Sequence, residues 1–293
     1  MRSRMPSCRV RSAVALATAT AAVTTGAGLG ASPALADDAT VHRYAALGDS
    51  YASGAGVPNA ADQTCSRSDR NYPALVNSGL TPGRHQDVTC AGATTEDLNS
   101  AQFPSVAPQL DALSKDTDLV TLTIGGNDIG FGDIIVRCVS LGLLNPLGSP
   151  CKTSYTWTGH DELAATIEST APKISKALDD IRGRAPHAKI LVTGYPAILP
   201  DDGSNCPSVV SIAKGDAPWL RDTHKHLNSM IAKQADEHGA VYVDTYSKSV
   251  GHDVCKPVGT RWVEPLITNA AAPFHPNAAG EKSMADSVLA AAR

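Results

Sequence analysis

The chain has 293 residues, of which 42% are hydrophobic, and its formal charge is −4 at pH 7. This length and apolar content allow one domain with a large buried core. The negative charge gives the chain no general attraction for nucleic acid, so we expect no nucleic-acid partner.

The first 36 residues have the three parts of a secretory signal peptide. Four arginines precede a weakly apolar Ala/Thr-rich stretch, and Ala34-Leu35-Ala36 supplies the small residues of a cleavage site. Thr, Gly, Ser and Pro interrupt the stretch, which makes a membrane anchor the poorer alternative. We predict a leader over residues 1–36, one mature domain over residues 37–293, and secretion from the cell. Loss of four arginines and no acid would change the formal charge from −4 to −8.

Strand-like and helical segments alternate along the mature chain. The clearest helix spans residues 161–184, where apolar residues recur at helical spacing and Asp161 is a suitable N-cap; another follows Pro218. Three of the strands are nearly continuous apolar runs, as in strands that are covered on both faces. Alternation of strand and helix predicts an α/β fold, a three-layer α/β/α sandwich with a five-stranded parallel sheet. The predicted strands span residues 43–47, 86–89, 118–124, 188–194 and 240–244.

Four motifs bring chemically useful residues to the ends of these elements. Three follow strand-like runs and the fourth precedes a final predicted helix, so a parallel sheet would bring them to one edge. A serine on a tight turn after a strand is exposed, and the next backbone N–H groups point at whatever it attacks. The motifs are Gly48-Asp49-Ser50, Cys90-Ala91-Gly92, Gly125-Gly126-Asn127-Asp128 and Pro273-Phe274-His275-Pro276-Asn277.

In this order the motifs closely resemble those of the SGNH hydrolase superfamily, the GDSL group, and most of all its secreted actinomycete-type lipases and esterases. The resemblance extends over nearly all of the chain after the leader. It implies the SGNH hydrolase fold, with flavodoxin-like strand order and ligands at the carboxyl ends of the strands.

Hydrolysis of an ester needs a nucleophile, a base and donors for the oxyanion of the tetrahedral intermediate. The resemblance implies that Ser50 is the nucleophile and His275 the base. The oxyanion hole would consist of the Ser50 N–H, the Gly92 N–H and the Asn127 side-chain amide. A glycine lets its N–H approach the substrate closely, and an amide donates without bringing a charge.

The group that orients the histidine departs from the common pattern of the superfamily. Many members have an aspartate three positions before the histidine, where this chain has Ala272. The related actinomycete lipases use a Ser/His dyad in which a backbone carbonyl accepts the imidazole N–H. We therefore expect the carbonyl of Ala272 or Pro273 to orient His275 and no carboxylate to be catalytic. Asp253 is a more distant alternative.

Six cysteines remain once Cys8 leaves with the leader, and an even number in an exported protein is typical of a disulfide framework. No Cys-x-x-Cys occurs and the cysteines are scattered, so we expect no metal site. The resemblance implies pairing in sequence order. The implied pairs are Cys65–Cys90, Cys138–Cys151 and Cys206–Cys255.

Several other polar residues next to the motifs are interpreted as structural. Asp49 and Asp128 are expected to bond loop backbone. His224 and His226 lie two positions apart on a predicted helix, so their side chains diverge and a joint metal site is disfavoured. Aromatic residues near a sheet edge are as often core as cleft, so three that flank the motifs stay outside the predicted site. These are Tyr51, Phe131 and Phe274.

Two long stretches, residues 130–159 and 197–217, lack regular periodicity and contain cysteines. Loops of this length are usually functional or cross-linked. The first is rich in apolar residues, so we hypothesise that it forms one wall of an acyl-chain pocket; a cap over the core is the equal alternative. The apolar residues are Ile134, Ile135, Val139, Leu141, Leu143, Leu144 and Leu147.

We predict a secreted serine ester hydrolase without a cofactor, a lipase that cleaves triacylglycerol and other acyl esters. Its partner is the acyl-ester substrate, and we expect a monomer without a membrane anchor. Phospholipase or short-chain carboxylesterase activity at the same site is the alternative, because chain-length and head-group preference depend on pocket shape. A secreted binding module that has lost catalysis would show damage to at least one motif residue, and none is damaged.

Overall fold

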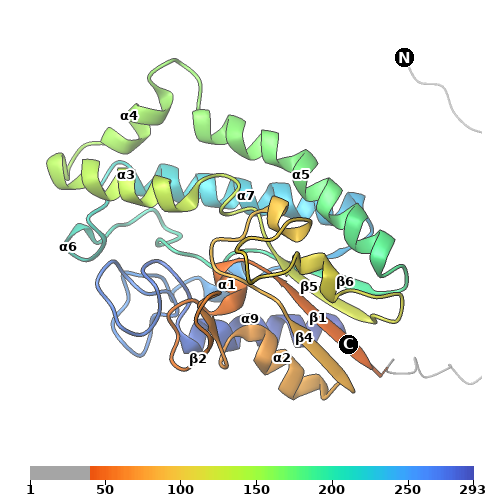
Figure 1. Cartoon of the computed structure of the whole chain (residues 1–293). Coiled ribbons are helices and arrows are strands. Elements are labelled where there is room, and N and C mark those ends of the chain that lie inside the picture. Colours follow the sequence, from red (N-terminus) through yellow and green to blue (C-terminus); the bar gives the residue numbers. More distant parts are fainter. Residues whose placement is uncertain (1–39) are drawn as a thin grey trace, which may run out of the picture. The chain divides into compact units, whose positions relative to one another are not determined.

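The computed structural model describes residues 40–293, so the leader predicted over residues 1–36 lies outside the described residues. A five-stranded parallel sheet forms its centre (Figure 1). The strands follow the order β4-β1-β5-β6-β7, which is the flavodoxin-like order that the resemblance implies. They are β1 (Arg43–Gly48), β4 (Arg84–Asp87), β5 (Leu119–Thr123), β6 (Lys189–Thr193) and β7 (Val241–Val243).

The register of the sheet is continuous from edge to edge. One row across it contains Asp87, Ala46, Thr121, Leu191 and Val241, in the order of the strands. The chain leaves β1 first toward β4 on one side and later returns to β5 on the other. Ligands of doubly wound sheets bind where the order reverses in this way, at the carboxyl ends of the strands.

Helices cover both faces of the sheet (Figure 1). The long helices α5 (Glu162–Arg184) and α7 (Ala217–Glu237) pack against each other over one face. On the other face α2 (Tyr72–Leu80) packs against α9 (Ala278–Ala292). This arrangement confirms the three-layer α/β/α sandwich.

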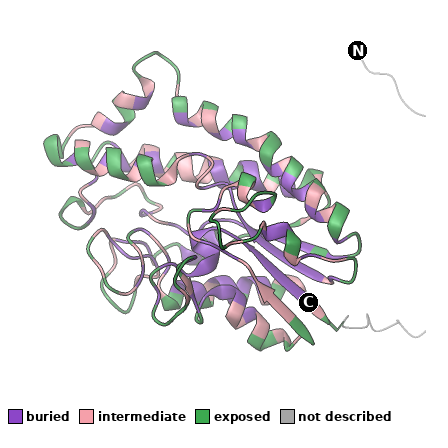
Figure 2. Cartoon of the chain, viewed as in Figure 1, coloured by how far each residue is buried: buried purple, intermediate pink, exposed green. Residues whose placement is uncertain are grey.

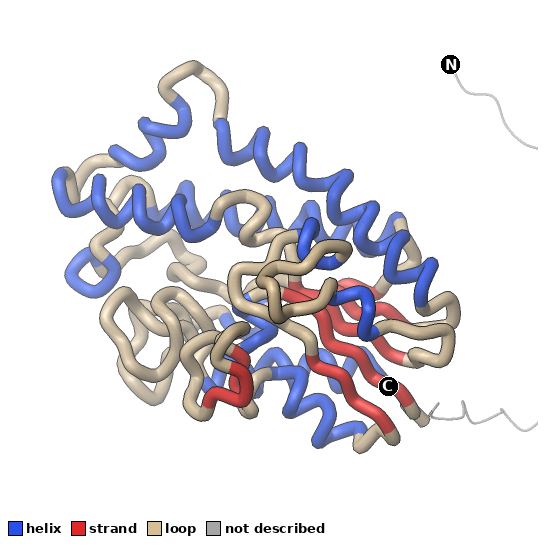
Figure 3. The backbone as a smooth tube through the Cα atoms, in the orientation of Figure 1, coloured by secondary structure: helices blue, strands red, loops and turns tan. Residues whose placement is uncertain are grey.

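Each layer of helices covers its own buried core. Because side chains alternate along a strand, Ala45 and Leu47 of β1 lie in the core beneath α5 and α7, whereas Tyr44 and Ala46 lie in the core beneath α2 and α9. Figure 2 shows buried strands at the centre of the sheet, an edge strand β4 that is only partly buried, and helices whose outer surfaces are exposed. Figure 3 shows irregular loops gathered beyond one end of the strands, where α1 (Ser50–Ser53) follows β1.

The helix predicted over residues 161–184 begins as its sequence indicates. The Asp161 side chain accepts hydrogen bonds from the N–H groups of Leu163 and Ala164, at 3.0 Å each, and so caps α5. The same carboxylate accepts a bond from the Trp219 indole at 2.8 Å, which ties α5 to α7. The Asp161 carboxylate therefore fixes the start of α5 and also holds α7 beside it.

Residues 130–159 are not the irregular stretch that the sequence predicts. They form α3 (Phe131–Leu144) and α4 (Pro150–Thr156), which are joined by the disulfide Cys138–Cys151. The apolar residues of α3 lie on both its buried and its exposed sides. Ile134 is buried, but Leu143 and Leu144 are 67% and 82% exposed. Because both sides of the helix are apolar, its period is hidden in the sequence. In the second stretch, residues 197–217, the short helix α6 (Pro207–Val210) is the one complete helix, and α7 begins at Ala217.

The remaining elements are short. The hairpin of β2 (Ala60–Asp62) and β3 (Arg67–Ser68) follows α1, and α8 (Tyr246–Ser249) follows β7. Two 3-10 helices are η1 (Thr95–Leu98) and η2 (Gln109–Ala112). None of the helices between residues 40 and 293 combines the length and the apolar composition of a membrane span. The disulfides join the pairs that the resemblance implies, Cys65–Cys90, Cys138–Cys151 and Cys206–Cys255.

Candidate active site

Ser50 lies on a tight turn at the carboxyl end of β1. Asp49 donates its backbone N–H to the Thr123 carbonyl at 2.9 Å, which holds the turn against β5. Gly48 has a φ of +145°, and a Cβ there would lie 2.6 Å from the Thr123 oxygen. Only glycine allows the two strands to stay this close at the point where Ser50 emerges.

The imidazole of His275 joins Ser50 to a backbone carbonyl. Its Nε2 lies 2.7 Å from the Ser50 Oγ, and its Nδ1 lies 2.8 Å from the Pro273 oxygen. A carbonyl can only accept, so Nδ1 carries the proton and Nε2 has the free lone pair that faces the hydroxyl. The Ala272 carbonyl accepts the His275 backbone N–H instead.

The loop that carries His275 docks directly on the turn that carries Ser50. Ala272 donates its N–H to the Ala55 carbonyl at 2.8 Å, and the Tyr51 hydroxyl donates to the Phe274 carbonyl at 2.5 Å. A Cβ at Gly56 would lie 2.4 Å from the Ala272 nitrogen, and Gly56 has a φ of +78°. Glycine at this position therefore allows the close approach of the two loops.

Glu264 anchors the histidine loop from the other side. Its backbone accepts from the Phe274 N–H at 2.8 Å, and its buried carboxylate accepts bonds from Arg261, Asn277 and Thr268. Burial raises the pKa of Glu264, but these hydrogen bonds outweigh it and hold the pKa below its ordinary value. The backbone of Glu264 thus holds Phe274 before the histidine, and its charged carboxylate holds Asn277 after it.

The candidate oxyanion donors follow three neighbouring strands. Gly92 comes after β4, Ser50 after β1 and Asn127 after β5, so the serine lies between the other two. Within residues 40–293 the N–H groups of Ser50 and Gly92 donate to no protein group. Gly92 has a φ of +83°, which favours glycine. The Asn127 amide donates one N–H to the Ala93 carbonyl at 2.8 Å, which leaves its second N–H for a ligand.

A buried network connects the serine turn to the loop of Asn127. The Asp49 carboxyl accepts bonds from the Tyr51 N–H at 2.9 Å and the Tyr195 hydroxyl at 2.5 Å, and that hydroxyl accepts from the Gly126 N–H at 2.8 Å. Burial raises the pKa of Asp49 to about 7, although the bonds from Tyr195 and Tyr51 oppose the increase. Asp49 therefore bonds loop backbone directly at Tyr51, and through the Tyr195 hydroxyl it is connected to the backbone of Gly126.

Asp128 and Asp253, which the sequence also singles out, bond loop groups and not Ser50 or His275. Asp128 accepts bonds from the Thr95 N–H and hydroxyl. Asp253 accepts from the Cys255 N–H, while Pro273 occupies the ring nitrogen that Asp253 would have bonded in the alternative arrangement. The part of the chain from residue 40 onward contains no group of three or more His, Cys, Asp or Glu side chains that could hold a metal ion.

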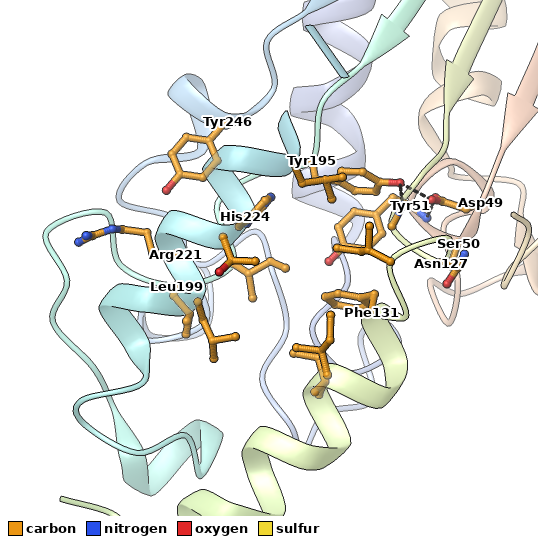
Figure 4. A pocket seen from close by; sticks show the side chains of 18 of the residues that line it. Asp49, Ser50, Tyr51, Asn127, Phe131, Tyr195, Leu199, Arg221, His224 and Tyr246 are labelled. Atoms are coloured by element: carbon orange, nitrogen blue, oxygen red, sulfur yellow. Dashed lines mark hydrogen bonds between the residues drawn. The ribbon is translucent and has the colours of Figure 1, made fainter. Parts of the chain in front are cut away.

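A mostly apolar pocket extends from Ser50 between α3 and α7 (Figure 4). Ile134 and Ile135 of α3 and Leu220 and Leu227 of α7 line it. The wall hypothesis for residues 130–159 thus fits the first turns of α3, whereas the exposed residues near the helix end, such as Leu144, lie outside the lining.

Three aromatic residues outside the predicted site lie close to Ser50 and His275 or line the pocket beside them. The Tyr51 ring lies 4.8 Å from the His275 ring, and the Phe131 ring lies 6.0 Å from it in an edge arrangement. Tyr51, Phe131 and Tyr195 line the pocket, whereas Phe274 is buried core. The positions of Tyr51 and Phe131 beside motif residues were the only local signal for this role.

Comparison with known proteins identifies the family. The GDSL-like Lipase/Acylhydrolase family matches residues 46–282. The chain belongs to this family. Lipase 2 of Streptomyces coelicolor is 46% identical over 252 residues, which cover 84% of each chain.

Solved structures agree with the family. The extracellular lipase of Streptomyces rimosus superposes with a TM-score of 0.72 at 30% identity, over 86% of this chain and 100% of that one. Phospholipase A1 of Streptomyces albidoflavus gives a TM-score of 0.71 at 30% identity, over 85% and 99%. The fold and the family of GDSL lipases and esterases predicted from the motifs are therefore confirmed.

The surroundings of His275 predict the acidic limit of activity. Burial lowers the pKa of His275 from its ordinary value of 6.5, and the bond to Pro273 opposes this only in part. The ring loses its proton as pH rises through the pKa, and only the neutral ring can accept the Ser50 proton. We expect kcat/KM for a soluble ester to exceed half of its plateau value at pH 6.5.

Asp49→Asn provides the control for this measurement, because Asp49 has a pKa of about 7 and would also titrate. The amide can still accept the Tyr51 N–H but does not ionise. In Asp49→Asn, the pH at which kcat/KM reaches half of its plateau value should still lie below 6.5. A midpoint above 6.5 in both proteins would contradict the assignment to His275.

Proposed function

We propose that this GDSL-family protein is a secreted serine ester hydrolase, a lipase that cleaves triacylglycerol and other acyl esters through a Ser50/His275 dyad. The contact of 2.7 Å between Ser50 Oγ and the unprotonated His275 Nε2 carries the proposal. The apolar pocket that begins at Ser50 supports an acyl chain as the bound part of the substrate.

The proposed reaction proceeds through an acyl-enzyme. Ser50 Oγ attacks the ester carbonyl carbon while His275 Nε2 takes its proton, and the Pro273 carbonyl bonds the imidazolium at Nδ1. The N–H groups of Ser50 and Gly92 and the Asn127 amide hold the oxyanion. The intermediate then expels the alcohol, which takes the proton from Nε2. Water, deprotonated by the same nitrogen, releases the acid and restores Ser50.

A carbonyl stabilises the imidazolium less than a carboxylate would, but it orients the ring equally well. Residues 40–293 supply every group of this sequence of steps, and no step requires a cofactor. We expect a monomer, which is sufficient for a site built from one chain.

Two features of the chain support secretion. The leader predicted over residues 1–36 would direct export, and three disulfides within residues 37–293 suit an oxidising environment. A relative of known structure is named an extracellular lipase.

Phospholipase activity at the same site is the second candidate, because a relative of similar fold is named phospholipase A1. The two candidates differ in the alcohol that leaves, whereas the acyl pocket serves both. A series of p-nitrophenyl esters from acetate to palmitate, together with triacylglycerol and a diacyl phospholipid, separates lipase, phospholipase and short-chain esterase by relative kcat/KM.

Replacement of the nucleophile tests the proposal. Ser50→Ala removes the attacking oxygen but changes little volume, so hydrolysis of every ester in the series should be lost while the melting temperature stays nearly unchanged. Ser78→Ala, at an exposed position of α2, is the matched control and should retain full activity. Substantial turnover by Ser50→Ala would disprove the serine mechanism.

Loss of the Asn127 amide tests the oxyanion hole. Asn127→Ala should lower kcat roughly 10²- to 10³-fold, as expected when one preorganised donor is removed, with little change in KM. The exposed Asn145, at the end of α3, offers the control Asn145→Ala, which should leave kcat unchanged. A decrease of less than threefold in Asn127→Ala would exclude this amide from the hole.

A further inference from the structure

One residue that lines the acyl pocket has a buried polar atom without a hydrogen-bond partner. His224 Nε2 is buried and unbonded, and of the four such side-chain atoms within residues 40–293 it alone belongs to a residue that lines this pocket. In Figure 4 the imidazole lies between the end of the pocket at Ser50 and Asn127 and the end at Arg221 and Tyr246. An acyl chain that extends from Ser50 toward Arg221 would therefore pass His224.

Few polar groups lie close to the His224 ring. Leu220 and Leu227 lie one turn before and one turn after it on α7, and both line the pocket. The ring meets Tyr195 and Tyr246 in edge arrangements, with centroids 6.4 Å and 5.4 Å away. The hydroxyls of these tyrosines bond Asp49 and Asp201 and so are directed elsewhere.

The imidazole is neutral at the pH where the dyad works. Burial lowers the pKa of His224 to about 4, and the backbone of Tyr195 opposes this only in part. A neutral ring has one donor and one acceptor nitrogen. It suits a neutral partner, because an anion would bring an unpaired charge into an apolar pocket.

We infer that the pocket selects acyl chains that carry a hydroxyl group along their length, and that His224 Nε2 binds this hydroxyl. The inference rests on the proposed function, because the chain enters the pocket from the ester at Ser50. A hydroxyl both donates and accepts, so it satisfies either tautomer of the ring. His224 is then a specificity-determining residue of the acyl pocket.

Two effects favour a hydroxylated acyl chain over a plain one. A plain alkyl chain would leave Nε2 without a partner, whereas a hydroxyl would satisfy it. A hydroxyl within the apolar pocket would be unpaired without His224. Sites built to bond a substrate hydroxyl reject the analogue that lacks it, so we expect a preference of roughly 10-fold or more in kcat/KM.

The test compares p-nitrophenyl dodecanoate with p-nitrophenyl hydroxydodecanoates in which the hydroxyl is moved along the chain. The wild-type protein should hydrolyse at least one hydroxylated isomer roughly 10-fold faster in kcat/KM than the plain ester. His224→Leu should lose this preference and hydrolyse the plain ester as well as or better than the wild type. His224→Gln, which keeps a hydrogen-bonding side chain, should retain part of the preference.

His226→Leu is the matched control, because His226 lies two positions later on α7 and bonds Glu168 at the surface. It should keep the wild-type preference. A wild-type protein that favours no hydroxylated isomer, or a His224→Leu variant that keeps the preference, would overturn the inference. If His224→Leu does not fold, the wild-type comparison decides. Failure to hydrolyse either kind of ester would instead refute the proposed function.

Discussion

The carbonyl oxygen of Pro273 controls what this site can do, because it decides which nitrogen of His275 carries the proton. It lies 2.8 Å from Nδ1, and the opposite nitrogen lies 2.7 Å from Ser50 Oγ. A proton on Nδ1 leaves a lone pair that can accept the serine proton. With the other tautomer, Nε2 would donate its N–H to Ser50 Oγ and could not accept the serine proton. Proton transfer from Ser50 therefore depends on the alignment of the carbonyl, the imidazole and the hydroxyl.

Much of the structure around the sheet edge serves this alignment. The histidine loop is held from one side by the turn at Gly56 and from the other by the buried carboxylate of Glu264. The bonds of Asp49 and Tyr195 connect the serine turn to the loop of Asn127. Because these contacts are buried and mutually bonded, the site is ordered before a substrate arrives, which is what preorganised catalysis needs. In the proposed function, the apolar pocket then binds the acyl chain of the substrate.

Local signals in the sequence were sufficient for the strands, for the cap at Asp161 and for the four motifs, because each depends on residues close together in the chain. The strand order came from the family resemblance, which also limited the orienting carbonyl to that of Ala272 or Pro273. The structure identifies Pro273 as the one that contacts the ring. The sequence did not indicate helix α3, because its apolar residues lie on both its buried and its exposed sides and hide the helical period. Glu264 and His224 carried no local signal, since their contacts at the site come from segments that only folding brings together.

The protonation state of His275 tests the central claim most directly, and ¹⁵N NMR of the imidazole reports it. At a pH above the histidine pKa, the spectrum of the full mature chain should show a protonated Nδ1 and a bare Nε2. The signals are assigned by their loss in His275→Ala. In Ser50→Ala the tautomer should remain, because the Pro273 carbonyl and not the serine fixes it. A proton on Nε2 in the neutral ring would contradict the account.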